Sequence, residues 1–266
     1  MSHSRFQPTM FVNKDPPDDI IRFVSDWLLA EITKLGNDPN IEIEAKLGVL
    51  VEKRSRAADE RIKMAALTET VISESYFLQN VRFKSEMTLD YHGNFNRLLN
   101  KAVEDQRGAI RYTHRYEADK FYSPRRQNGE KVRVSVNKKT DEIIAVIEKT
   151  RVANLNVYSP NTGLDYRISI NVETPVDAPY NEDEVIYQRD KDRLSYVHQC
   201  VQIDLTQVID DSGKKVHELE LEFASTEQIL KEKEKLDHRQ PNQFQEIVGI
   251  LIKNVRVLAR ESNKFK

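Results

Sequence analysis

Two kinds of hydrophobic periodicity divide this chain. Near both ends, apolar residues recur every three or four positions, which predicts amphipathic helices. One such segment covers residues 17–35, another covers about 241–259, and a shorter apolar stripe at 95–103 indicates a further helix. Ser225, with Gln228 three residues later, has the spacing of a capping box at the start of a helix. Helices are therefore expected on either side of the central region.

From residue 41 the pattern changes to an alternation of apolar and polar residues, which predicts β-strands. Residues 110–208 contain successive strands separated by turn sequences such as 127–129, 159–163 and 210–213. This order predicts a β-meander within a β-rich α+β fold. We expect one domain over residues 1–266, with residues 1–16 as a flexible N-terminal segment.

The polar faces of these strands are segregated by charge. Alternate side chains of a strand share one face, and successive ones lie roughly 7 Å apart, so carboxylates in such a row repel one another. Glutamate is also depleted in strands. A solvated antiparallel sheet would account for the alternation but would more naturally mix charges. The acidic rows are Glu42 and Glu44, and Glu218, Glu220 and Glu222; the basic row is Arg189, Lys191 and Arg193.

The two kinds of row predict a ligand that contains both a cation and anions. Clustered carboxylates are hard oxygen donors that suit Mg²⁺ or Mn²⁺. A row of arginine and lysine suits several phosphates. A metal-bound polyphosphate explains both rows if the sheet closes into a barrel whose polar faces point inward. The apolar faces would then point outward and be covered by the flanking helices.

Composition adds few constraints. The formal net charge is only −2, although 32% of the residues are charged, so the distribution of charge carries the information. The single cysteine, Cys200, excludes an internal disulfide and favours a reducing compartment; we expect it to be a small core residue. No apolar run approaches the roughly 20 residues of a membrane helix, so we expect a soluble protein without a membrane partner.

Six sequence motifs resemble those of the fungal RNA 5′-triphosphatases, which are the β subunits of mRNA-capping enzymes and belong to the triphosphate tunnel metalloenzymes. The resemblance extends from about residue 41 to 223, whereas residues 108–117 match less distinctly and are assigned no role. It implies an eight-stranded antiparallel β-barrel, the triphosphate tunnel, with a polar interior. In chain order the motifs are residues 41–48, 132–135, 167–173, 189–196, 204–206 and 218–222.

The resemblance also implies roles for individual residues. Glu173 is our candidate to orient or deprotonate the attacking water, and Arg189 is placed to assist in phosphate binding. The remaining acidic residues would hold metal-bound waters, brace basic side chains or orient the water. The implied metal ligands are Glu42, Glu44 and Glu222; the groups that bind substrate phosphate are Arg133, Lys149, Arg189, Lys191 and Arg193; and the catalytic set is Arg133, Lys149, Glu173, Lys191, Arg193, Asp204, Glu218 and Glu220.

The implied reaction is hydrolysis of the γ-phosphate of 5′-triphosphate RNA, which leaves a 5′-diphosphate end in the first step of mRNA capping. Hydrolysis of nucleoside triphosphates with manganese or cobalt is implied as well, and the expected cofactor is a divalent cation, Mg²⁺ or Mn²⁺. The implied partners are the nascent RNA, a second copy of the chain, an mRNA guanylyltransferase and the RNA polymerase II tail, in the nucleus. An inorganic tripolyphosphatase or another tunnel triphosphatase is the alternative enzyme, and a non-catalytic polyphosphate- or RNA-binding barrel is the alternative of another class.

Overall fold

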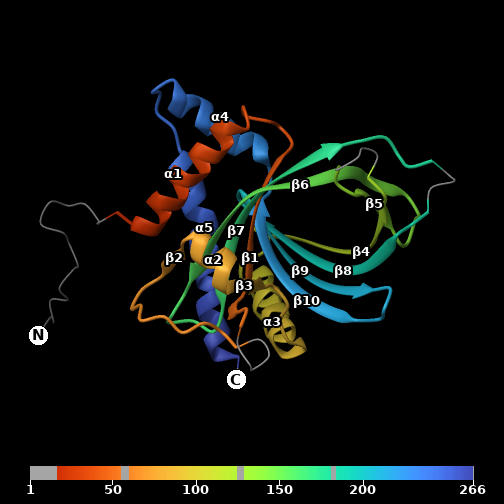
Figure 1. The fold of residues 1–266 in the computed structure, drawn as a ribbon, viewed down its shortest axis with the longest axis horizontal. Helices are drawn as coiled ribbons and strands as arrows, with labels where there is room; N and C mark the ends of the chain where they lie inside the picture. Colours follow the sequence, from red (N-terminus) through yellow and green to blue (C-terminus); the bar gives the residue numbers. More distant parts are fainter. Residues whose placement is uncertain (1–16, 55–59, 125–128, 181–183, 266) are drawn as a thin grey trace, which may run out of the picture.

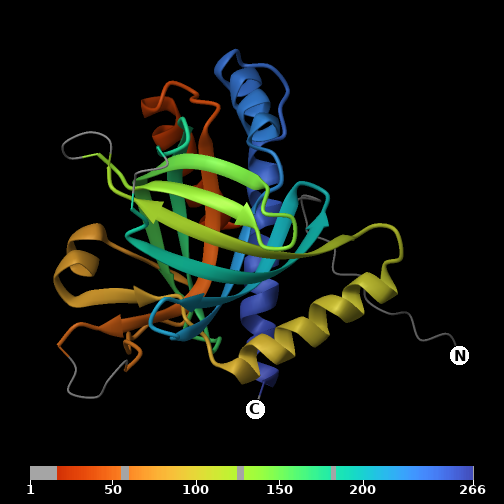
Figure 2. The same ribbon diagram turned by 90° about the vertical axis from the view of Figure 1, so that its right-hand side faces the viewer.

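The computed structural model describes residues 17–54, 60–124, 129–180 and 184–265. The predicted flexible segment 1–16 lies outside the described residues. A β-barrel forms one half of the molecule, and helices pack against one of its sides (Figure 1). Figure 2, turned by 90°, shows strands β4, β5 and β6 curving across the side of the barrel opposite helix α5.

The barrel consists of eight antiparallel strands and is closed. Its strand order is β1, β7, β6, β5, β4, β8, β9 and β10, and β10 pairs again with β1, with Glu44 opposite Glu222. This confirms the predicted fold. The strands are β1 (Ile41–Glu52), β4 (Arg111–Tyr122), β5 (Val132–Asn137), β6 (Ile143–Tyr158), β7 (Asp165–Pro175), β8 (Tyr187–His198), β9 (Val201–Asp210) and β10 (Lys215–Phe223).

The meander prediction is correct only within two runs of strands. Strands β4 to β7 follow one another around the barrel, and so do β8 to β10. Consecutive strands β7 and β8 are not neighbours, because β1 pairs with β7 on one side and with β10 on the other, while β8 pairs with β4. The N-terminal strand β1 therefore joins the two runs, which alternation along the chain could not reveal.

Two short strands and a short helix extend the barrel wall near the C-terminal end of β1. Strand β2 (Thr70–Ile72) pairs with β6, strand β3 (Val81–Lys84) pairs with β1, and α2 (Glu74–Asn80) connects them. Phe77 and Phe83 pack here against a second hydrophobic cluster that includes Leu50 and Val81. The close approach of β3 to β1 is possible because residue 48 is glycine.

The helices lie close to their predicted positions. They are α1 (Asp19–Lys34), α3 (Leu89–Asp105), α4 (Thr226–Asp237), α5 (Phe244–Glu261) and the 3₁₀ turn η1 (Ser262–Lys264). Helix α3 begins six residues before its predicted start, where the Thr88 hydroxyl accepts a hydrogen bond from the Tyr91 amide at 3.4 Å. The capping-box prediction is correct in position, because Ser225 is the N-cap residue of α4, but the Ser225 side chain makes no capping bond. The adjacent Thr226 hydroxyl instead donates to the Ile41 carbonyl at 2.7 Å.

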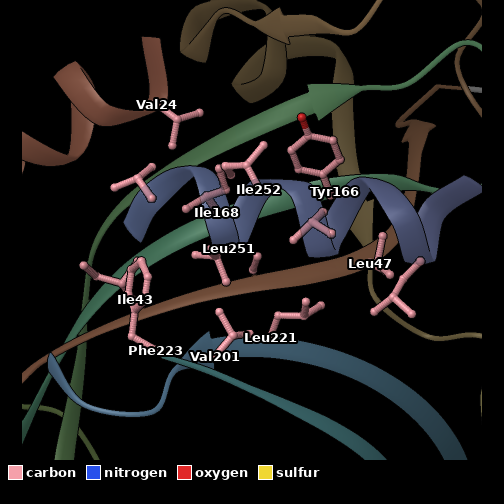
Figure 3. Packing of buried hydrophobic residues seen from close by; sticks show 14 of the residues in the cluster. Val24, Ile43, Leu47, Tyr166, Ile168, Val201, Leu221, Phe223, Leu251 and Ile252 are labelled. Carbon is pink, nitrogen blue, oxygen red and sulfur yellow. The ribbon is translucent and has the colours of Figure 1, made fainter. Parts of the chain in front are cut away.

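The main hydrophobic core lies between the barrel wall and the helices. Outward-facing Ile43, Leu221 and Ile168 pack with Leu251 and Ile252 of α5 (Figure 3). Buried Cys200 belongs to this core and has a free thiol, as predicted. None of the helices in the described ranges has the length and apolar character needed to span a membrane.

Helix coverage of the barrel is one-sided. The predicted arrangement, with apolar outer faces under helices, holds for β1, β7, β9 and β10, whose outward residues belong to the main core. On β4, in contrast, the outward-facing Tyr112 is 44% exposed. The outer face of the barrel is thus apolar mainly on the strands that helices α3 and α5 contact.

Gly48 provides a test of the packing between β1 and β3. A methyl group added there would overlap the Lys84 carbonyl oxygen and lie 2.8 Å from Cζ of Phe83. Because a backbone atom blocks the space, Gly48→Ala should lower the free energy of unfolding by about 1–3 kcal/mol. Thermal or urea unfolding of the purified variant measures this change.

Gly93→Ala is the matched control for this substitution. In helix α3 the added methyl group would meet only the Arg97 side chain, at 3.9 Å. Since alanine favours a helix interior over glycine, this variant should be more stable than the native chain by about 0.5–1 kcal/mol. Equal effects of the two substitutions would contradict the close approach of β3 to β1.

Candidate active site

The barrel encloses a polar cavity of about 440 Å³. Six carboxylates and eight cationic side chains line it, so charges of both signs face a common space. The lining side chains are Glu42, Glu44, Lys46, Arg115, Arg133, Lys149, Arg151, Glu173, Arg189, Lys191, Arg193, Gln202, Thr206, Glu218, Glu220 and Glu222. All of the predicted site residues except Asp204 line this cavity directly, and Asp204 lies behind Arg193.

The three predicted metal ligands come from neighbouring strands. Glu42 and Glu44 occupy alternate positions on β1, and Glu222 lies opposite Glu44 on β10. Asn171 of β7 orients the first two, because its amide nitrogen donates to Glu42 Oε2 at 2.7 Å and to Glu44 Oε1 at 3.2 Å. The Gln202 amide likewise donates to Glu222 Oε1 at 2.7 Å. Each carboxylate is therefore held by a neutral amide or an ammonium.

Negative charge around Glu222 exceeds the nearby positive charge. Burial raises the pKa of Glu222 to about 8, and the carboxylates of Asp204, Glu42 and Glu220 contribute to the rise. Burial also raises the pKa of Glu42, although the Lys149 ammonium acts in the opposite direction. Bringing a cation close to these groups would favour their ionised forms.

The donor chemistry of this cluster fits a hard divalent cation. All three side chains offer carboxylate oxygens, which are ligands of Mg²⁺ and Mn²⁺. As the side chains stand, no three acidic, histidine or cysteine residues in the described ranges already form a metal-binding group. The Lys149 ammonium pairs with Glu42, lies 3.9 Å from Glu44 Oε2 and is 3.1 Å from Glu173 Oε1. It thus neutralises part of the charge that a metal ion would neutralise.

Carboxylates hold two of the cations on β8 in position. The Lys191 ammonium lies 2.5 Å from Asp119 Oδ2, and Arg193 donates to Asp204 Oδ2 at 2.9 Å. Glu117 Oε2 lies 3.6 Å from Nε of Arg193. Because these carboxylates are almost fully buried, the cations are fixed from behind and their remaining N–H groups are free to face the cavity.

Glu173 anchors the cations on the opposite wall. Its Oε1 accepts a hydrogen bond from Arg133 at 3.0 Å and also contacts the Lys149 ammonium. Burial alone would raise the pKa of Glu173, but Lys149 and Arg133 together hold it below its ordinary value. At neutral pH Glu173 is therefore a carboxylate that can accept hydrogen bonds.

The acidic row of β10 has other partners. Glu220 Oε1 lies 2.5 Å from the Lys46 ammonium, which lowers the pKa of this buried carboxyl despite the opposing effect of burial. Glu218 accepts a hydrogen bond from the Ser85 hydroxyl at 3.0 Å. Arg189 lies 3.6 Å from Asp119, the carboxylate that also contacts Lys191, and it lines both this cavity and a hollow at one end of it.

Sequence reasoning missed the contribution of β4. Arg115, Glu117 and Asp119 occupy alternate inward positions on this strand. Asp119 is 1% exposed and accepts a hydrogen bond from the Ser135 hydroxyl at 2.7 Å. The signal was hidden because the outward residues His114 and Tyr116 are not aliphatic, so the strand does not alternate in hydrophobicity. Charge alternation from Arg115 to Asp119 was the available clue.

Comparisons with known proteins agree with this arrangement. The family model described as mRNA capping enzyme, beta chain, matches residues 14–264. The mRNA-capping enzyme subunit beta of Schizosaccharomyces pombe is 33% identical over 264 residues, covering 94% of this chain and 84% of that protein. The corresponding subunit of Cryptococcus neoformans is 32% identical and covers 93% of this chain, which spans only 63% of that relative.

Solved structures show the same fold. The S. pombe Pct1 RNA triphosphatase in complex with the Spt5 CTD has a TM-score of 0.87 and 33% identity, covering 96% of this chain and 99% of that chain. Another structure of the S. pombe Pct1 RNA triphosphatase has a TM-score of 0.85 and 31% identity, with 98% and 99% of the two chains covered. The closed barrel, the polar interior and the match over nearly the whole sequence place this chain in the family of mRNA-capping enzyme β chains.

Proposed function

We propose that this chain removes the γ-phosphate from the 5′-triphosphate end of RNA, the first step of mRNA capping, and hydrolyses nucleoside triphosphates at the same site. The observation that carries the proposal is the closed barrel in which a carboxylate cluster faces a set of anchored cations. Membership of the capping-enzyme family and the likeness to an RNA triphosphatase structure support RNA as the substrate.

Glu42, Glu44 and Glu222 are the proposed ligands of a divalent cation, Mg²⁺ or Mn²⁺. When bound, such an ion supplies Lewis-acid polarisation of a phosphoryl oxygen. Burial and the neighbouring carboxylates raise the pKa of Glu222 to about 8, and this surplus of negative charge supports the assignment. Asn171 and Gln202 hold these carboxylates and are the proposed positioning residues.

Arg133, Lys191 and Arg193 are the proposed γ-phosphate-binding groups, with Lys149 and Arg189 beside them. Phosphoryl transfer needs little covalent chemistry from the protein, so positioning and charge neutralisation supply most of the catalysis. The carboxylates of Asp119, Asp204 and Glu173 fix these cations and limit their loss of side-chain entropy on binding. Glu173 also accepts hydrogen bonds beside the γ-phosphate-binding groups, where it would orient the attacking water.

Localisation and assembly are proposed on the same basis. Capping acts on nascent mRNA, so we propose a nuclear protein that works with an mRNA guanylyltransferase and the RNA polymerase II tail, and that forms a homodimer. The S. pombe RNA triphosphatase was solved in complex with the Spt5 CTD, which supports a partner of this kind. Light scattering of the purified chain tests dimer formation directly.

Release of phosphate from three substrates tests the proposed activity. The wild-type chain should release phosphate from γ-labelled 5′-triphosphate RNA and from ATP with added Mg²⁺ or Mn²⁺, and chelation should abolish the release. Tripolyphosphate hydrolysis without RNA hydrolysis would favour an inorganic tripolyphosphatase. Binding of these compounds without any metal-dependent release would favour a non-catalytic barrel.

Glu42→Ala tests the metal-binding cluster. Loss of one proposed ligand should lower kcat/KM by at least about 100-fold, whereas the fold should be retained because the side chain faces the cavity. Glu52→Ala is the matched control, since Glu52 lies at the exposed end of the same strand. Phosphate release and thermal unfolding are measured for both variants. Wild-type activity of Glu42→Ala would exclude this carboxylate from the site.

Asp119→Asn tests the anchoring of Lys191 through its pH dependence. Burial already lowers the pKa of Lys191, Arg193 and Arg189 lower it further, and Asp119 raises it. Without the carboxylate the pKa should fall, so Lys191 loses its proton at a lower pH. The alkaline limb of the kcat/KM profile should therefore move to lower pH, with a fall of about tenfold or more at neutral pH.

Asp192→Asn provides the control for this profile. Asp192 lies next to Lys191 on β8 but points outward, where it contacts His114 Nε2 at 2.6 Å. Its pH–rate profile should match that of the wild type. An unchanged alkaline limb in Asp119→Asn would contradict the proposed role of the Asp119 carboxylate in keeping Lys191 protonated.

A further inference from the structure

A second hollow, of about 520 Å³, adjoins the interior cavity at one end of the barrel. Arg133, Lys149, Arg151 and Arg189 line both spaces, so the hollow is a mouth of the tunnel. Phosphate-binding groups therefore continue from the interior to this mouth. The additional lining residues include two aromatic side chains and a lysine, which the phosphate chemistry does not require.

The two aromatic side chains extend the inward-facing rows of β4 and β8. Phe121 follows Asp119 on β4, Tyr187 precedes Arg189 on β8, and the two residues lie opposite each other in the sheet. Their rings stack with centroids 4.2 Å apart and an interplanar angle of 9°. The Lys131 ammonium lies 4.7 Å above the other face of the Tyr187 ring. The mouth thus combines an aromatic pair with an exposed positive charge.

Aromatic residues at the other end of the barrel already pack against other side chains of the protein. Arg167 lies six residues before Glu173 on β7, roughly 20 Å along the strand. Phe77 and Phe83 lie over its guanidinium, with ring centroids 5.1 and 4.7 Å from Cζ. Both rings also pack in the second hydrophobic cluster. They cannot stack on a ligand without leaving that cluster, whereas the side chain over the Tyr187 ring is the exposed Lys131.

We propose that this mouth binds the first nucleoside of the RNA, with its base stacked on Tyr187. The inference rests on the proposed function and gives the substrate a direction: the γ-phosphate lies deepest, among Arg193, Lys191 and Arg133, and the nucleoside lies at the mouth. When the base binds, the Lys131 ammonium moves off the Tyr187 ring. Together with Arg151 it then contacts the phosphodiester that follows the first nucleoside. Stacking of this kind tolerates any base, because every base has a π-face.

A comparison of substrates with and without a base tests the proposal. KM is measured for 5′-triphosphate RNA and for ribose 5-triphosphate, with wild-type protein and with Tyr187→Ala and Tyr187→Leu. Loss of the ring should raise KM for the RNA about tenfold. The KM for ribose 5-triphosphate should not change, because this compound has no base to stack. The ratio of its KM to the KM for RNA should therefore fall by the same factor. Tyr187→Leu retains an apolar contact with Phe121, so it separates loss of stacking from loss of folding.

Lys131→Ala tests the phosphodiester contact in the same assay. It should raise KM for the RNA and weaken the dependence of that KM on salt, with a smaller effect for ribose 5-triphosphate. The matched controls are Tyr116→Ala and Lys139→Ala. These residues form the same kind of pair, with the Lys139 ammonium 4.6 Å from the Tyr116 ring centroid, but on the outer face of the barrel. Both controls should keep wild-type KM values for both substrates.

Two results would overturn the proposal. One is a KM for RNA that stays at the wild-type value in both Tyr187 variants while thermal unfolding shows them folded. The other is an equal rise in KM for RNA and for ribose 5-triphosphate in Tyr187→Leu, which would assign the residue to the triphosphate rather than the base. Failure of the proposed function is distinguishable, because the wild-type chain would then release no phosphate from the RNA.

Discussion

Closure of the barrel by the pairing of β1 with β10 is the constraint on which the rest of the structure depends. This single ladder places Glu44 opposite Glu222 and Lys46 opposite Glu220, although the partners are more than 170 residues apart in sequence. Without it, the two runs of strands would form an open sheet with its charged face in water. With it, the same side chains surround an enclosed space in which ionic interactions are stronger than in water.

An interior of this kind is stable only because its charges compensate one another. Removing an ion from water costs several kcal/mol unless partners satisfy it. Here each anchored cation has a carboxylate neighbour, as Lys191 has Asp119 and Arg193 has Asp204. Where compensation is incomplete, at Glu222, the pKa is raised. That imbalance marks the place where the proposed metal and phosphates would complete the pairing, so stability and function are linked by the same charges.

Much of this site was predictable because strand geometry is simple. On β1 and β10 an aliphatic outer face makes the inward row obvious, since helices or core cover the other side. Strand β4 lacks that cover at Tyr112, His114 and Tyr116, so its two faces look alike in sequence and Asp119 went unrecognised. The start of α4 is held by the Thr226 hydroxyl, which donates to the distant Ile41 carbonyl, and Ser225 makes no side-chain capping bond. A local sequence pattern cannot reveal such a contact.

The sequence by itself determined most of the secondary structure, the inward rows of the regular strands and, through its six motifs, the resemblance to capping triphosphatases. These follow from period-two and period-3.6 patterns, which are local properties of the backbone. Only the tertiary structure decided which rows face each other, which carboxylate anchors which cation, and that Phe121 and Tyr187 stack at one mouth. Strand pairing between distant segments sets those relations, because burial and charge compensation act across the whole barrel rather than along the chain.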